Sequence, residues 1–243
     1  MENILNFFTN KPNFIEFITF GPVHLLILFI ALIISIFIFR IKSENRNLEL
    51  FIGYVLIFQQ IALYSWYFIR NFNPIKEGLP LYHCRVAIIF LGLGLIFKNK
   101  HLTKLGSYLG IFGSISALLF PAMDPFKFPH ITQFSFFIGH LFLLWGSIYS
   151  LSVKKIGMSK LDLNSSLVFI NIYHVLMYII NNSIHSNYGY MSTPPFPIGV
   201  HLPHLLYGLL VIIMFNIIFI GEYIFINKIS VYRKNKDDYD LVF

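Results

Sequence analysis

The sequence predicts an all-α membrane protein built as a bundle of seven transmembrane helices. Of the 243 residues, 56% are hydrophobic and only 12% are charged, whereas a soluble domain carries about a quarter charged residues. The mean hydropathy is +0.69, and long runs of Ile, Leu and Phe recur along the whole chain. A helix satisfies all its backbone polar groups inside lipid, and these runs are long enough for helices to cross a bilayer.

Seven apolar runs define the predicted helices. Residues 1–20 mix phenylalanines with polar groups, and we expect a short helix at the membrane surface there; no cleavable signal pattern is present. The helical domain then covers residues 21–226, and a charged cytoplasmic tail covers residues 227–243. The seven predicted spans are residues 21–41, 48–69, 79–97, 102–119, 134–153, 167–180 and 202–226.

Small residues and prolines shape the middle of the chain. The fourth span contains Gly106-x-x-x-Gly110, a pattern typical of closely packed membrane helices. Pro121 ends this span because proline cannot continue a helix, and the loop that follows to Pro129 is constrained by further prolines. We expect spans three, four and five to pack around an outward-facing pocket.

The basic residues predict the orientation of the bundle. Thirteen of the eighteen Lys and Arg residues lie in the tail or in the loops after the first, third and fifth spans. The opposite side has only Lys11, Arg70, Lys76 and Lys127. Because cytoplasmic loops are enriched in Lys and Arg, we expect a multi-pass protein of the cell membrane with its N-terminus outside and its C-terminus in the cytoplasm. The net charge of +7 indicates contact with anionic lipid, not with nucleic acid.

A short stretch, Leu79-Pro-Leu-Tyr-His-Cys-Arg85, opens the third span and holds the only cysteine of the chain. A single cysteine excludes an intrachain disulfide. Cys84 and His140 each lie about five or six residues into a span, which places both roughly 8–9 Å below the outer surface at 1.5 Å per residue. A thiol and an imidazole at one depth predict nucleophilic catalysis, in which the histidine increases the thiolate fraction.

Structural roles for the same residues remain open at this point. Cys84 can be a small buried packing residue, and His140 can make a hydrogen bond between packed helices. His130 can be an ordinary loop residue, and Asp124 can cap a helix or pair with Arg85 or a histidine. Six of the nine histidines lie in or near the outer third: His83, His130, His140, His185, His201 and His204.

The histidines do not predict a metal site. His201-x-x-His204 has a spacing that suits metal ligands, but no carboxylate lies nearby. No His-x-x-x-His or His-Glu-x-x-His pattern occurs in the sequence. We therefore predict neither a metal nor a cofactor.

Five segments stand out for their motifs: residues 79–84, 117–124, 128–130, 136–140 and 187–190. Together they resemble the YwaF/TMEM164 family of integral membrane proteins, in particular its bacterial members, over roughly residues 20–225. The resemblance implies a phospholipid acyltransferase that acts through a cysteine, as the animal member is regarded to do. By position that cysteine corresponds to Cys84, and its histidine partner corresponds most simply to His140.

The resemblance and the residue pattern together give a predicted site for a phospholipid or lysophospholipid. Cys84 would form a thioester, and His140 would act as general base and acid, oriented by His130 or Asp124. We expect one His140 ring nitrogen within about 3–6 Å of the Cys84 sulfur. The predicted substrate-binding residues are His83, Arg85, Asn187, Tyr188 and Lys127; of these, Arg85 or Lys127 would hold the lipid phosphate.

Membrane lipids are thus expected as substrate and as surroundings, while the sequence leaves the oligomeric state open. A function of a different class fits the same residues: a non-enzymatic transporter or ligand-binding protein whose polar residues line an outward-facing cavity. The sequence shows no inverted repeat and no paired broken helices that would favour a transporter.

Overall fold

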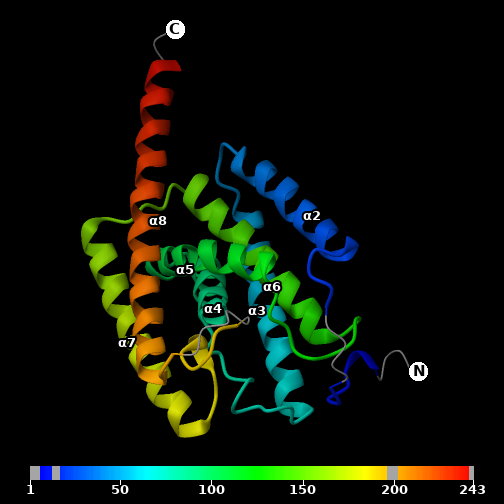
Figure 1. The fold of residues 1–243 in the computed structure, drawn as a ribbon. Coiled ribbons are helices and arrows are strands. Elements are labelled where there is room, and N and C mark those ends of the chain that lie inside the picture. The colour runs from blue at the N-terminus through cyan, green and yellow to red at the C-terminus, as the bar shows by residue number, and fades with distance from the viewer. Residues whose placement is uncertain (1–5, 13–16, 196–201, 241–243) are drawn as a thin grey trace.

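The computed structural model describes residues 6–12, 17–195 and 202–240, with only the backbone for 229–240. Within these residues the chain forms seven long α-helices and one short 3-10 helix, without a β-strand (Figure 1). The elements are α2 (Pro22–Phe39), α3 (Arg46–Ile69), α4 (His83–Ile96), α5 (Lys100–Leu119), α6 (Ile131–Ser152), α7 (Lys160–Ile184), η1 (Tyr188–Tyr190) and α8 (His204–Asp240).

The predicted all-α class is confirmed, and each predicted span coincides with one helix. Six of these helices are long and apolar enough to cross a membrane, whereas α4 is apolar but has only 14 residues. Residues 6–12 and the end of α8 lie toward opposite ends of the bundle (Figure 1). Seven crossings, and the cytoplasmic side of the C-terminus, stay predictions. The tail predicted from residue 227 continues the α8 helix to Asp240. Of the predicted surface segment, residues 1–5 and 13–16 lie outside the described residues, and among the others only residues 6 and 7 are helical.

Helix α4 packs against α3, α5 and α6 in the middle of the bundle (Figure 1). Glycines allow the close approach: a methyl group at Gly106 of α5 would lie 2.4 Å from the backbone nitrogen of Leu91 in α4. One turn further along α5, a methyl group at Gly110 would lie 2.5 Å from the Ser147 hydroxyl of α6. The close packing predicted for this glycine pair is confirmed, and its two members serve two different neighbouring helices.

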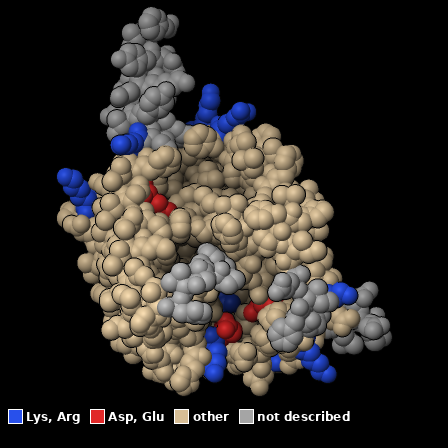
Figure 2. All heavy atoms as spheres, viewed as in Figure 1, with Lys and Arg blue, Asp and Glu red and all other residues tan. Residues whose placement is uncertain are grey.

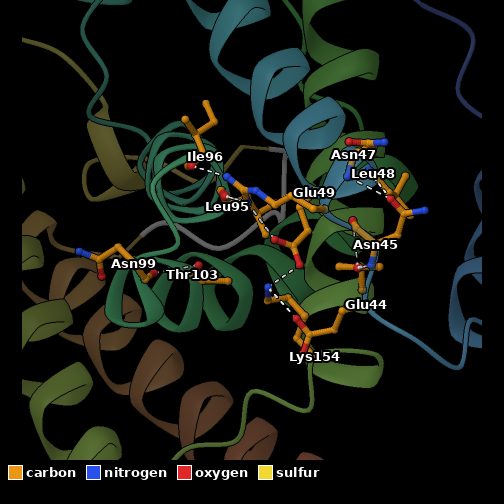
Figure 3. Close-up of polar contacts among 12 residues, drawn as sticks. Glu44, Asn45, Asn47, Leu48, Glu49, Leu95, Ile96, Asn99, Thr103 and Lys154 are labelled. Atoms are coloured by element: carbon orange, nitrogen blue, oxygen red, sulfur yellow. Dashed lines mark hydrogen bonds and ion pairs between the residues drawn. The ribbon is translucent and has the colours of Figure 1, made fainter.

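A charged cluster ties α3, α4 and α6 together at one end of the bundle (Figure 3). Arg46 donates hydrogen bonds to the Leu95 and Ile96 carbonyls at the end of α4, both at 2.6 Å. Glu49, which is only 2% exposed, forms ion pairs with Arg46 and with Lys154, just after α6. The last carbonyls of a helix have no hydrogen-bond partner within it. Arg46 supplies partners for those of α4, while the negative charge of Glu49 offsets the positive charges of Arg46 and Lys154.

Helices α7 and α8 form a pair that packs beside the core made by α3, α4, α5 and α6 (Figure 1). The side-chain amides of Asn171 and Asn216 donate hydrogen bonds to each other at 3.0 and 2.8 Å. Such reciprocal amide bonds join helices inside a membrane, where an apolar driving force between helices is absent. On the face drawn in Figure 2, the charged residues gather toward the two ends and leave a largely uncharged belt between them, which suits a protein surrounded by lipid.

Candidate active site

Arg85, in the first turn of α4, is held from several sides. One terminal nitrogen donates hydrogen bonds to the Glu77 and Leu79 carbonyls, and the other donates to the Tyr67 hydroxyl at 3.1 Å. The guanidinium also lies over aromatic rings, which attract a cation through their electron-rich faces. The ring centroids lie 5.0–5.8 Å from the guanidinium carbon and belong to Tyr64, Tyr67 and Tyr82.

Two carboxyl groups lie near this guanidinium without forming an ion pair with it. Asp124 accepts a hydrogen bond from the Tyr67 hydroxyl and Glu77 accepts one from the Tyr82 hydroxyl, each at 2.7 Å. Burial raises the pKa of both carboxyls, against the opposing effect of these hydrogen bonds and of Arg85. The cation therefore faces acids that are already engaged with tyrosines. Figure 2 shows acidic and basic atoms together in a hollow at the loop end of the molecule.

The sequence-based prediction that Asp124 can pair with Arg85 is thus replaced by a bridge through Tyr67. Glu77 and Tyr67 were not among the predicted site residues. Glu77 lies in the short turn before the cysteine stretch, and Tyr67 lies in the aromatic end of the second span. Both residues could have been predicted from Arg85, because a charge buried in a membrane protein needs polar partners. An acidic and a phenolic residue lie close to Arg85 in the sequence.

Cys84 is a half-buried free thiol that faces α5. A methyl group at Gly113 of α5 would lie 3.2 Å from its sulfur. The electrostatic neighbours of the sulfur are Arg85, Tyr173 of α7 and Tyr190 of η1. The thiol therefore sits where α4, α5, α7 and the η1 turn meet.

His140 is buried in α6, and its Nδ1 donates a hydrogen bond to the Phe136 carbonyl at 2.7 Å. Because a neutral imidazole carries one proton, Nε2 is then the acceptor, as a general base requires. The preceding residue, Gly139, packs against Ile88, which lies one turn along α4 from Cys84. Within the described part of the chain no hydrogen bond joins His140 to Cys84, so the predicted 3–6 Å separation stays a prediction.

His130 lies apart from this pair, at the N-cap of α6. Its Nε2 donates to the Thr9 carbonyl at 3.0 Å, and its Nδ1 accepts from Thr132 at 2.9 Å. The ring stacks on Phe126 with centroids 4.0 Å apart. Both nitrogens are occupied, so the structure gives His130 a capping role and does not bring it to His140.

The predicted substrate-binding residues are scattered. Tyr188 is buried, and its hydroxyl donates to the Ile75 carbonyl at 2.8 Å. The Asn187 side chain bonds within its own loop, to Thr193 at 2.9 Å. Lys127 is exposed on the loop between α5 and α6. Of the five predicted residues, Arg85 is the one that lies beside Cys84 with its charge directed into the cluster.

His83 points away from Cys84 and toward α7 and α8. Its Nε2 lies 2.8 Å from Nε2 of His174 in α7, and both histidines are buried. The Phe215 ring of α8 stacks on His83 with centroids 4.1 Å apart. His83 therefore joins helices, and its partner His174 was not predicted as a site residue. No cluster of three or more metal-binding side chains occurs among the described residues; His201 lies outside them.

The apolar helices indicate a multi-pass membrane protein, and a polar cluster is buried near one end of its bundle. The chain belongs to the TMEM164 family, whose family model matches residues 19–226 and thus the helical domain almost completely. The resemblance seen in the sequence motifs is thereby confirmed. No curated protein and no solved structure matches the chain.

Proposed function

We propose that this protein is a membrane acyltransferase or transacylase that acts on phospholipids or lysophospholipids through Cys84, with its site at the outer side of the cell membrane. The observation that carries the proposal is the position of the only thiol next to Arg85, whose neighbouring carboxyls are engaged with tyrosines. A guanidinium left without a direct carboxylate partner is suited to bind the phosphate of a lipid.

The chemistry assigns one role to each group. The Cys84 sulfur attacks the carbonyl carbon of the donor ester while its proton moves to Nε2 of His140. When the tetrahedral intermediate collapses, the ester C–O bond breaks and the departing oxygen takes that proton from His140. The products are a thioester on Cys84 and a lysophospholipid. The hydroxyl of an acceptor lipid then attacks the thioester by the reverse sequence, which restores the thiol.

The hydrogen bond of His140 supports its role as the proton acceptor. Its Nδ1–H is fixed on the Phe136 carbonyl, which orients the ring and leaves Nε2 as the atom able to take a proton. The missing hydrogen bond to Cys84 is compatible with the role, because catalytic pairs are often loose without substrate. Arg85 orients the lipid by its phosphate, so that the ester near the headgroup reaches the sulfur.

The test uses the purified protein in lipid nanodiscs that contain a phospholipid with a labelled acyl chain and an unlabelled lysophospholipid. We expect transfer of label, and an acyl adduct on Cys84 in the intact-protein mass spectrum. Cys84→Ala should abolish both, and His140→Asn should slow transfer about 10²–10⁴-fold. His101→Asn, an exposed histidine at the other end of the bundle, serves as the matched control.

Two results would count against the proposal. Transfer that persists in Cys84→Ala would remove the thioester mechanism. Lipid binding without any turnover, lost when Arg85 is replaced, would instead favour the non-enzymatic ligand-binding alternative.

A further inference from the structure

The turn after α7 is fixed in place by an unusually complete set of hydrogen bonds. The Asn181 side chain donates to the Tyr188 carbonyl and accepts from the Tyr188 amide, both at 2.8 Å. The Asn187 side chain accepts from the amides of Ser192 and Thr193 at 3.0 and 3.1 Å. These bonds anchor both halves of the turn, so its side chains project in defined directions.

Tyr190 differs from the other polar side chains of residues 186–193 in its hydrogen bonding. Its neighbours in this segment each have a hydrogen-bond partner: Ser186, Asn187, Tyr188, Ser192 and Thr193. The Tyr190 hydroxyl, by contrast, makes no hydrogen bond within the described part of the chain. The Tyr190 side chain is half-buried, so its O–H is available to bond a ligand that reaches the start of α4.

The backbone is held in an unfavourable conformation to place this ring. Gly189 and Tyr190 both adopt left-handed backbone angles, with φ of 63° and 51°. Glycine tolerates this region, whereas a bulky residue there is strained by about 1–3 kcal/mol. Strain of this kind persists where the surrounding structure enforces it, and it concentrates at functional sites.

The ring is thereby directed toward the start of α4. It packs against Tyr82 with centroids 5.3 Å apart, and the preceding Gly189 contacts His83, so that a methyl group there would lie 3.3 Å from the His83 ring. Burial raises the pKa of the Tyr190 hydroxyl, and the nearby Cys84 sulfur raises it further, while Arg85 opposes the shift. The hydroxyl therefore keeps its proton and is available as a donor.

We propose that Tyr190 is a catalytic residue whose hydroxyl donates a hydrogen bond to the oxyanion formed when Cys84 attacks an ester. This inference rests on the function proposed above and adds a residue to it. When the C–S bond forms, the electron pair of the carbonyl π bond moves to the carbonyl oxygen, which becomes negative. Tyr190 donates a hydrogen bond to this oxygen without transferring its proton. The pair returns when the C–O bond breaks, and the leaving oxygen takes its proton from His140.

The test compares two reactions of the same thiol, which is unambiguous because Cys84 is the only cysteine. p-Nitrophenyl butyrate acylates the thiol through an oxyanion and releases coloured nitrophenolate. Iodoacetamide alkylates the thiol by displacing iodide and forms no oxyanion. We expect Tyr190→Phe to slow acylation about 10²–10³-fold, as the loss of one oxyanion donor does, and to leave alkylation unchanged. Tyr54→Phe, at an exposed position of α3, is the matched control.

Unchanged acylation in Tyr190→Phe would overturn the inference. An equal fall in acylation and alkylation would overturn it too, because Tyr190 would then act on the thiol or on the fold. A failure of the proposed function has a different signature: the unmodified protein would not be acylated, or Cys84→Ala would react equally well, and the role of Tyr190 would fall with it.

Discussion

His83 and His174 are buried and meet through their Nε2 atoms, 2.8 Å apart. One of these nitrogens must donate and the other must accept, so the pair shares a single hydrogen. Since His83 begins α4 and His174 lies in the middle of α7, this bond fastens the α7–α8 pair to the core beside Cys84. Phe215 of α8 completes the contact by stacking on His83.

Replacing one histidine of this pair should therefore cost more than replacing both. His174→Phe leaves the His83 nitrogen buried without a partner, which costs about 1–3 kcal/mol, whereas removal of both polar groups is less damaging. We expect the double variant His83→Phe/His174→Phe to unfold at a higher temperature than the sum of the single effects implies. Tryptophan fluorescence during heating in detergent measures this. Strictly additive single effects would mean that the bond contributes nothing.

The glycines of the bundle differ sharply in the space around them. A methyl group at Gly106 would lie 2.4 Å from a backbone atom of α4, while nothing lies within 4 Å of such a group at Gly221. We expect Gly106→Ala to lower stability by about 1–3 kcal/mol because α4 and α5 must separate. Gly221→Ala should be neutral or should stabilise by up to about 1 kcal/mol, since alanine favours the helix. The unfolding temperatures of the two variants test this prediction. An equal change in Gly106→Ala and Gly221→Ala would contradict it.

The buried His130 predicts a dependence of stability on pH. Burial lowers the pKa of His130, although its hydrogen bond to the Thr9 carbonyl opposes the shift. The unfolded chain then binds this proton more readily than the folded chain, so stability falls as the pH drops below about 6.5, the usual histidine value. His130→Asn keeps a capping oxygen but does not titrate. Its unfolding temperature should vary less between about pH 7.5 and pH 5, whereas the exposed His101→Asn should follow the parent protein.

Arg85 should determine the affinity for the lipid phosphate. Arg85→Lys keeps the charge but loses the planar group that bonds in several directions at once. The loss of one charge-assisted hydrogen bond costs about 1.5–3 kcal/mol, which corresponds to a rise in KM of about tenfold or more for a phospholipid donor. The acylation rate with p-nitrophenyl butyrate, which has no phosphate, should change little. Equal effects on both substrates would argue against phosphate recognition, and Lys98→Gln controls for a loss of charge elsewhere.

The helices were largely predictable because membrane spans are defined by composition. The errors at their ends have physical causes. The sixth span was predicted as residues 167–180, but α7 covers Lys160–Ile184, because Ser159 and Asp162 form a capping box and Asn171 bonds to a carbonyl of its own helix. The third span was predicted to begin at residue 79, but α4 begins at His83, because the residue before Pro80 disfavours helix.

The site was less predictable because its contacts join distant segments. Cys84, Arg85 and Asp124 were found as unusual residues for a membrane span or its loops. His83 and His174 are 91 residues apart in the sequence, so no local sequence pattern predicts that they pair. Tyr188 and Tyr190 are equivalent in the sequence, but Tyr190 has a left-handed backbone and interacts electrostatically with the Cys84 sulfur, whereas the Tyr188 hydroxyl bonds to the Ile75 carbonyl. Such angles arise from the whole turn, not from the residue itself.

The shortness of α4 has a consequence for the surrounding lipid. Its 14 residues rise about 21 Å at 1.5 Å each, against a hydrocarbon thickness of about 30 Å. The remaining depth falls to the chain before His83, which includes Glu77, and to the nearby α5–α6 loop, which includes Asp124; tyrosines hold both carboxyl groups. Acyl chains cannot solvate such groups, so we expect the bilayer to thin there, or to admit water, through hydrophobic mismatch. A locally dimpled leaflet would bring the ester of a neighbouring lipid down to the level of Cys84 without removing that lipid from the membrane.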